Sequence, residues 1–249
     1  MVNRFSTGVL DNLFPLRCHL CGLSCKTSVP LCSRCELALS PNRSPCARCG
    51  LPLPFLCTTI TAPDQICGTC QRCPPVFDAV RAPWLYEQHI GYLIGQWKYQ
   101  RNARMTGLMT HLFLTGFTAA TPDLIVPVPL NWRRQLWRGF NQAERLAQGL
   151  VDNHPRLKHP LVSGTIRCKR SSAETSQSHL GARQRAALAR DTFTVAGRCD
   201  NLTIAIIDDV LTTGATANAL ATALRKAGAS HVEVWCIART PAPANNLMS

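Results

Sequence analysis

Residues 203–216 read TIAIIDDVLTTGAT, and this stretch decides the fold. Residues 203–207 form a short continuous apolar run, which is typical of a strand covered on both faces. Apolar residues then recur at helical spacing from about residue 216 to 227, and Gly228 supplies a stop. A second apolar run at residues 231–237 predicts another strand. Because a strand, a crossover helix and a strand normally give a parallel sheet, the segment predicts an α/β domain.

The turn between the first strand and the helix has the features of a phosphate site. Backbone N–H groups at a helix N-terminus lack intrahelical partners and lie at the positive end of the helix dipole. Residues 212–216, called the glycine turn below, include Gly214, which permits close backbone approach, and Ala215. Thr212, Thr213 and Thr216 add hydroxyl donors. The turn has neither the lysine of a nucleoside-triphosphate P-loop nor the spacing of a dinucleotide fingerprint.

Two adjacent acids, Asp208 and Asp209, precede the glycine turn. Carboxylates in this position would repel a phosphate. We therefore expect this acidic doublet to face sugar hydroxyls or a magnesium-coordinated sugar. A phosphorylated sugar satisfies both the turn and the doublet.

Other stretches upstream fit the same architecture. Residues 90–97 and 105–112 carry apolar side chains at i, i+3, i+4 and i+7, which predicts two amphipathic helices. Residues 123–130 read DLIVPVPL and predict a buried strand that ends in a proline-bounded turn, with a helix from about Asn141. The C-terminal part of the chain therefore alternates strands with helices.

The composition limits the classes of protein to consider. Of the 249 residues, 46% are hydrophobic and 16% charged, which excludes a disordered acidic chain and a low-complexity repeat. No apolar run approaches the roughly 18 residues of a membrane span, and polar residues interrupt the first stretch before a signal-peptide core forms. We expect no membrane span and a cytoplasmic location. The net charge of +13 favours anionic partners, either phosphates or nucleic acid.

Cysteines are concentrated at the N-terminal end: eleven of the fourteen lie within residues 18–73. Eight of them form four C-x-x-C pairs, and two such turns together supply the four thiolates of a tetrahedral zinc site. The spacing predicts two structural zinc sites, which we call the first and second four-cysteine groups. The first group comprises Cys18, Cys21, Cys32 and Cys35, and the second comprises Cys46, Cys49, Cys67 and Cys70.

Alternatives to zinc are a disulfide scaffold and redox C-x-x-C motifs. A reducing compartment disfavours disulfides, and four pairs in series disfavour a redox motif. Cys25, Cys57 and Cys73 are left over, and either ligand set could shift by one member. Because the segment buries little apolar surface, metal binding would supply its folding free energy. We predict a double zinc ribbon over residues 1–77 and an α/β domain over residues 78–249.

The stretch from the apolar run through Thr216 resembles the phosphoribosyl-pyrophosphate (PRPP) motif of type I phosphoribosyltransferases. Joined to the cysteine-rich N-terminus, it resembles the ComF/GntX family, competence and DNA-utilisation proteins with a double zinc ribbon and a phosphoribosyltransferase-like domain. Residues 126–130 followed by 138–142 are similar to a second signature of that family, and residues 97–99 resemble its early Lys-Tyr element. The resemblance covers nearly the whole chain.

The resemblance implies a parallel-sheet domain of the type I phosphoribosyltransferase fold that binds PRPP with magnesium. It assigns the ribose hydroxyls to Asp208 and Asp209 and the 5-phosphate to the glycine turn. Loss of pyrophosphate requires cationic side chains, and we choose Arg138 first, although a solvated basic loop or a nucleic-acid patch explains its charge equally well. Two functions stay open: phosphoribosyl transfer to an unknown acceptor, or a non-catalytic DNA-uptake factor that binds single-stranded DNA or a helicase partner.

Overall fold

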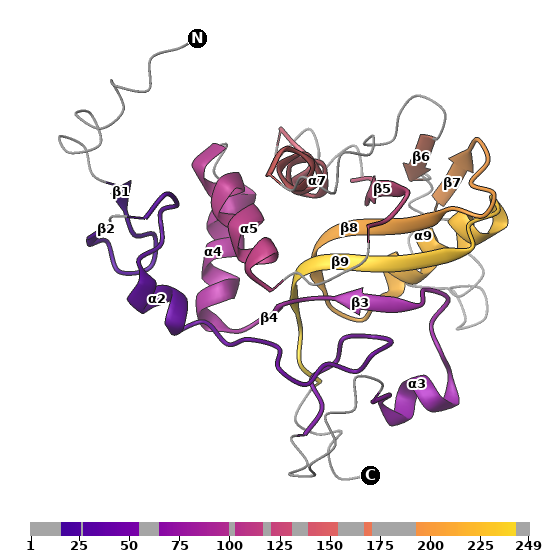
Figure 1. Cartoon of the computed structure of the whole chain (residues 1–249), viewed down its shortest axis with the longest axis horizontal. Coiled ribbons are helices and arrows are strands. Elements are labelled where there is room, and N and C mark those ends of the chain that lie inside the picture. Colours follow the sequence, from indigo (N-terminus) through magenta and orange to yellow (C-terminus); the bar gives the residue numbers. More distant parts are fainter. Residues whose placement is uncertain are drawn as a thin grey trace, which may run out of the picture.

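The central sheet is built from the apolar runs found in the sequence. In the computed structural model, which describes residues 16–25, 27–54, 65–99, 103–116, 121–130, 139–153, 167–170 and 193–242, four strands lie in the order β3-β9-β8-β5. Their bounds are Ala79–Arg81 for β3, Leu124–Pro127 for β5, Thr203–Leu211 for β8 and His231–Arg239 for β9. A short fifth strand, β4 (Trp84–Leu85), also pairs with β9. Every pairing in this sheet is parallel, as predicted (Figure 1).

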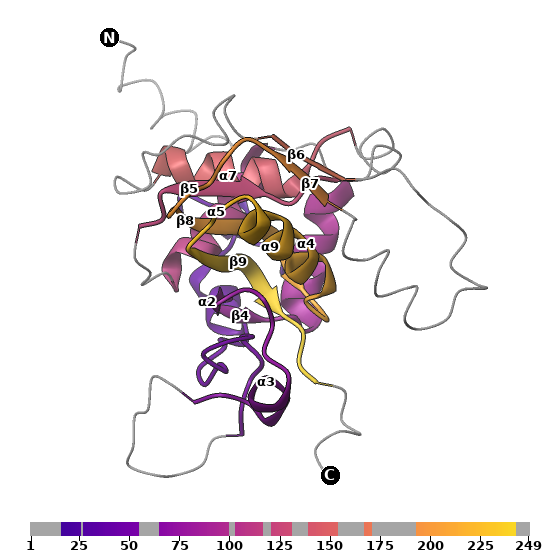
Figure 2. The same ribbon diagram turned by 90° about the vertical axis from the view of Figure 1, so that its right-hand side faces the viewer.

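Helices cover both faces of the sheet because its strands are apolar on both sides. Ala205 and Ile207 of β8 belong to one core cluster, which they share with α4 (Gln88–Tyr99), α5 (Ala103–Thr115) and α7 (Gln142–Asn153). Ile204 and Ile206 belong to a second cluster with α9 (Ala215–Lys226). Figure 2 shows α9 lying across the sheet. The predicted helices and their buried faces are confirmed.

The prediction that the first strand ends at residue 207 is wrong. Strand β8 continues to Leu211, because Asp208, Val210 and Leu211 still pair with β9. The acidic doublet therefore lies within the strand rather than in the loop that follows it. The helix after the glycine turn begins at Ala215, one residue before its predicted start.

The cysteine-rich part forms small elements that pack on the α/β part at two places. Strands β1 (Leu16–Arg17) and β2 (Ser24–Cys25) pair antiparallel, and α2 (Ser33–Leu37) follows. This portion lies beside α4 and α5, where Glu36 Oε1 is 3.2 Å from His111 Nε2 (Figure 1). The chain then passes to α3 (Gly68–Arg72), which precedes β3. The division at residue 77 stays a prediction.

A separate antiparallel pair, β6 (Arg167–Arg170) with β7 (Phe193–Ala196), completes the set of described strands. Strand β7 packs on α9, and Phe193 is buried in the same cluster as that helix. Within the described ranges, no helix combines the length and the apolar character needed to cross a bilayer.

Candidate functional site

A pocket of about 180 Å³ lies at the carboxyl ends of the neighbouring strands β5 and β8. This edge is where ligands bind in parallel α/β sheets. Both residues of the acidic doublet line the pocket, as does Thr216 of the glycine turn. The other lining residues come from α4, from the segment after β5, from the start of α7 and from β6: Lys98, Val128, Pro129, Leu130, Asn141, Gln142, Ala143 and Arg170.

Positive and negative groups meet in this pocket. Lys98 Nζ lies 2.8 Å from Asp209 Oδ2, and both side chains are largely buried. The backbone N–H of Asp209 donates to Asp208 Oδ1 at 2.8 Å. Desolvation, and after it the Asp209 charge, raises the pKa of Asp208 to about 7, although the charges of Lys98 and Arg170 act in the opposite direction. A hydroxyl donor or a cation would therefore stabilise the ionised Asp208.

The glycine turn has the backbone shape that a phosphate site requires. Gly214 caps α9 with a φ of +78°, a left-handed conformation that favours glycine. A Cβ atom at this position would have ordinary contacts, the nearest at 3.7 Å from Phe77 Cζ, so the backbone conformation rather than space requires the glycine. Thr212, Thr213 and Ala215 are exposed to solvent.

Among the described residues, the start of α9 keeps backbone N–H groups without an intrahelical partner. The Ala215 N–H donates to Thr213 Oγ1 at 3.3 Å, and the Asn218 N–H makes the first intrahelical bond, to the Gly214 carbonyl at 2.8 Å. The N–H of Thr216 lies between them, where helix geometry provides no intrahelical acceptor. Since Thr216 also lines the pocket, its backbone N–H and its hydroxyl are candidate donors to an anion.

Asn141 holds one wall of the pocket in place. Its Oδ1 accepts a hydrogen bond from the Ala143 N–H at 3.1 Å and so caps the first turn of α7. Its Nδ2 donates to the Val128 carbonyl at 3.1 Å, which ties the segment after β5 to that helix. The side chain is buried, so both bonds are shielded from water.

The two predicted four-cysteine groups are present with the predicted members. In each group the four Sγ atoms lie within 4.8 Å of one another. The Cys21–Cys32 and Cys49–Cys67 Sγ pairs are 3.9 and 3.7 Å apart. A tetrahedral zinc with Zn–S bonds of about 2.3 Å requires sulfur atoms about 3.8 Å apart. Both groups therefore fit zinc in a closed, structural site.

In each group one thiol has a lowered pKa. Burial alone would raise the pKa of Cys18, but hydrogen bonds, first from the backbone of Cys32, lower it to about 6. For Cys46 the hydrogen bonds, first from the backbone of Cys49, also outweigh burial and lower the pKa to about 7. Burial raises the pKa of Cys35 to about 12. A bound metal would stabilise the thiolate of such a residue.

Of the three spare cysteines, two lie outside these groups. Cys25 Sγ donates to the Leu16 carbonyl at 3.3 Å, and Cys73 is exposed. Cys57 falls outside the residues that the structure describes. Among the described residues, the two groups have the members that the C-x-x-C spacing indicates, and their role as zinc ligands stays a prediction.

Curated relatives match the chain over most of its length. The DNA utilization protein YhgH of Salmonella typhimurium is 34% identical over 235 residues, which cover 91% of this chain and 98% of that protein. The chain belongs to the ComF family. Competence protein F of Haemophilus influenzae is 29% identical, covering 92% and 99% of the two chains, and competence protein ComFC of Bacillus subtilis is 26% identical, covering 78% and 83%. No family model matches the chain.

The chain is also similar to solved structures. The purine phosphoribosyltransferase of Pyrococcus horikoshii has a TM-score of 0.32 and 21% identity, over 57% of this ComF-family chain and 76% of that protein. The α/β architecture with two four-cysteine groups follows from the sheet and the sulfur positions themselves.

Most predicted site residues of this ComF-family chain fall into two places. The acidic doublet and Thr216 line the pocket, while Thr212, Thr213, Gly214 and Ala215 follow the end of β8 on the side of the second four-cysteine group. Arg138 lies outside the described residues and stays a prediction. Lys98 and Asn141 were given no role in the sequence analysis. The Lys-Tyr element and the residues around 138–142 were the signals that pointed to them.

Proposed function

We propose that this ComF-family chain binds PRPP together with magnesium in the pocket at the carboxyl ends of β5 and β8. One observation carries the proposal: the acidic doublet, Thr216 and the cations Lys98 and Arg170 line the same small pocket. PRPP carries hydroxyls, a phosphate and a pyrophosphate, and this pocket offers groups suited to each of them. The names of the relatives place the family in DNA utilisation and competence.

Each part of the ligand is matched to a group of the protein. Asp208 and Asp209 accept hydrogen bonds from the ribose hydroxyls. The glycine turn binds the 5-phosphate where Thr216 reaches the pocket, while Thr212, Thr213, Gly214 and Ala215 line the neighbouring cavity. Lys98 and Arg170 offset the pyrophosphate charge. Two carboxylates do not fill a magnesium shell, so the ion would take its remaining oxygens from the ligand and water.

The reaction is transfer of the phosphoribosyl group to an acceptor not yet identified. The bond from C1 to the pyrophosphate oxygen breaks, a bond from C1 to the acceptor forms, and pyrophosphate leaves with the electron pair. Magnesium would supply charge neutralisation of the leaving group. Positive charge develops on the ribose ring, and the ionised doublet beside the hydroxyls stabilises it electrostatically.

Calorimetry with the zinc-loaded chain tests the binding step. We expect heat on titration with PRPP in magnesium, and a weaker interaction with ribose 5-phosphate. Thr216→Val removes one hydroxyl donor and should weaken both by roughly fivefold. Thr222→Val is the matched control, because Thr222 Oγ1 donates to the Asn218 carbonyl within the same helix. Folded protein without any PRPP heat would contradict the proposal.

Release of pyrophosphate tests the transfer step. A screen of free bases, amines and orotate, each with PRPP and magnesium, would identify the acceptor by the release it stimulates. If PRPP binds but no acceptor stimulates release of pyrophosphate, the chain is a PRPP-binding protein without transferase activity.

A second candidate function is a non-catalytic factor in DNA uptake. The net charge of +13 and the names of the competence relatives favour it. In this role the chain binds single-stranded DNA through phosphate contacts and docks on a partner such as a helicase. The two functions are separable, since DNA binding does not require the pocket.

A further inference from the structure

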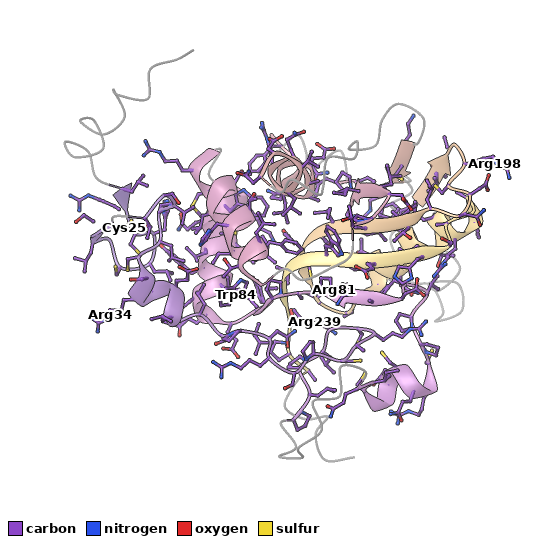
Figure 3. All side chains as sticks on the ribbon, viewed as in Figure 1. Cys25, Arg34, Arg81, Trp84, Arg198 and Arg239 are labelled. Atoms are coloured by element: carbon purple, nitrogen blue, oxygen red, sulfur yellow. The ribbon has the colours of Figure 1, made fainter. Side chains whose placement is uncertain are left out.

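Within the described part of the chain, Arg239, the last residue of β9, donates its hydrogen bonds to main-chain carbonyls. Its Nε donates to the Cys49 carbonyl at 2.9 Å, and its Nη1 donates to the Leu211 carbonyl at 3.0 Å and to that of Thr212. Nη1 also donates to the Thr240 carbonyl at 2.7 Å. The residue is 8% exposed, and no carboxylate of the described residues forms an ion pair with it. Figure 3 labels Arg239 where β9 reaches the cysteine-rich part.

These acceptors belong to two different parts of the molecule. Cys49 is a member of the second four-cysteine group, whereas Leu211 and Thr212 end β8 and begin the glycine turn. A guanidinium is planar and presents its donors in a fixed fork, so its bonds on one side restrict the position of the acceptors on the other. Arg239 is thus a rigid connection between the second four-cysteine group and the turn.

Next to Arg239 the same two parts face each other across a cavity of about 450 Å³. Its lining includes Cys67 and Cys70 from the second four-cysteine group and Thr213 and Gly214 from the glycine turn. Since this space separates the groups, Arg239 supplies a direct polar link where side-chain packing between them is incomplete.

We propose that Arg239 is a positioning residue that ties the start of the glycine turn to the second four-cysteine group, so that metal binding at this group orders the turn. The functional meaning rests on the proposed role of the turn in phosphate binding. The coupling itself depends only on Arg239 and its four acceptors. The first four-cysteine group has no such link to the turn among the described contacts and should not share the effect.

Amide hydrogen exchange of the full chain, measured by mass spectrometry on peptides that contain residues 212–216, tests the coupling without any ligand. Cys70→Ser removes a ligand of the second group, and Cys35→Ser removes a ligand of the first as its matched control. We expect Cys70→Ser to speed exchange in the turn by about tenfold or more, as loss of a charged hydrogen bond implies. Cys35→Ser should leave it unchanged.

A lysine at position 239 tests the contribution of the guanidinium geometry alone. Arg239→Lys keeps the charge but cannot span the two sets of carbonyls, so exchange in the turn should rise by a similar factor while the chain retains two zinc ions. Combining it with Cys70→Ser should add little, because both act through one connection. Arg225→Lys is the control, since Arg225 donates to the carbonyls of Ala229 and Ser230 and to the Asp78 carboxylate, all at the other end of β9.

Three results would overturn the proposal. They are unchanged exchange in Arg239→Lys, additive effects of the two substitutions, and loss of zinc from Arg239→Lys, which would make Arg239 a support of the metal group instead. PRPP calorimetry on the same variants separates this proposal from the proposed function. If the substitutions change amide exchange in the turn as expected but PRPP does not bind, the coupling through Arg239 stands and the proposed ligand is wrong.

Discussion

Lys98 and Asp209 form an ion pair that joins α4 to β8 at the pocket. Their separation of 2.8 Å and their low exposure make this a stronger contact than a surface ion pair. The pair fixes Asp209 beside Asp208 and keeps a cation within reach of an incoming anion. The lysine thus both orients the acidic doublet and contributes charge to the site.

Replacing this lysine should affect the pyrophosphate more than the phosphate. We expect Lys98→Gln to weaken PRPP binding by about tenfold, because a charged hydrogen bond is lost, and to change ribose 5-phosphate binding little. Calorimetry with both ligands measures the difference, and Lys226→Gln, which changes a lysine at the end of α9, is the control. Equal losses for the two ligands would place Lys98 at the phosphate instead.

The raised pKa of Asp208 predicts a pH dependence of stability. The group titrates near pH 7 in the folded chain, against an ordinary value of 3.8. Between these values the folded state holds more protons than the unfolded state, so the free energy of unfolding falls as pH rises. The asparagine side chain of Asp208→Asn cannot ionise, so this fall in the free energy of unfolding should disappear.

Urea unfolding of the zinc-loaded chain at pH 5 and pH 8 checks the sign. The stability of Asp208→Asn relative to the natural chain should increase from the lower to the higher pH. Asp152→Asn, at an exposed carboxylate on α7, should show a constant difference. A constant difference for Asp208→Asn as well would show that Asp208 is ionised throughout.

Among the elements, the two four-cysteine groups share a glycine directly after their first C-x-x-C pair. Gly22 and Gly50 both have positive φ, +74° and +67°. Their surroundings differ. A Cβ atom at Gly22 meets nothing within 4 Å, whereas one at Gly50 would lie 2.7 Å from Cγ1 of Val80 on β3. The second group therefore docks on the sheet through its glycine, and the first does not.

Alanine at the two glycines should separate backbone strain from docking. Gly22→Ala should cost about 1 kcal/mol, the strain of a left-handed residue. Gly50→Ala adds steric overlap with Val80 and should cost about 2–4 kcal/mol in total. Chemical denaturation of the zinc-loaded variants measures both. Equal costs would mean that the second group moves away from β3 without penalty.

Elements set by local pattern could be predicted, and those set by distant contacts could not. The β8-α9-β9 unit is visible because its strands are long apolar runs and its helix keeps one periodicity. Strands β3 and β4 have only three and two residues, too few for a pattern. The doublet was placed at the right edge of the sheet but outside its strand, since pairing with β9 is not a local property.

The same difference between local patterns and distant contacts decides which parts of the site could be predicted. Both four-cysteine groups could be predicted because C-x-x-C spacing is a local signal and four thiols complete one shell. The contact of Lys98 with Asp209 depends on how α4 packs against β8, and that of Arg239 with Cys49 joins residues 190 positions apart. A sequence shows such residues as ordinary cations.

For the whole molecule, the net charge of +13 predicts an interaction with nucleic acid that weakens with salt. Neutralised phosphates release counterions, so the logarithm of the affinity for single-stranded DNA should fall linearly as the logarithm of the salt concentration rises. Fluorescence anisotropy with a labelled oligonucleotide measures the slope, with a duplex of equal length for comparison. Undetectable binding at low salt would exclude direct DNA binding by the chain.

Strand β3 and strand β9 pair directly, and the contact of Arg81 with Glu233 spans 152 residues. During synthesis on the ribosome, the cysteine-rich part emerges first and β9 after all the other described strands. The two four-cysteine groups can therefore assemble before the sheet has a partner for β3, and Arg239 reaches Cys49 only when β9 has been added. The hydrogen bond from Arg239 to Cys49, which joins the second four-cysteine group to the sheet, is thus among the last contacts to form.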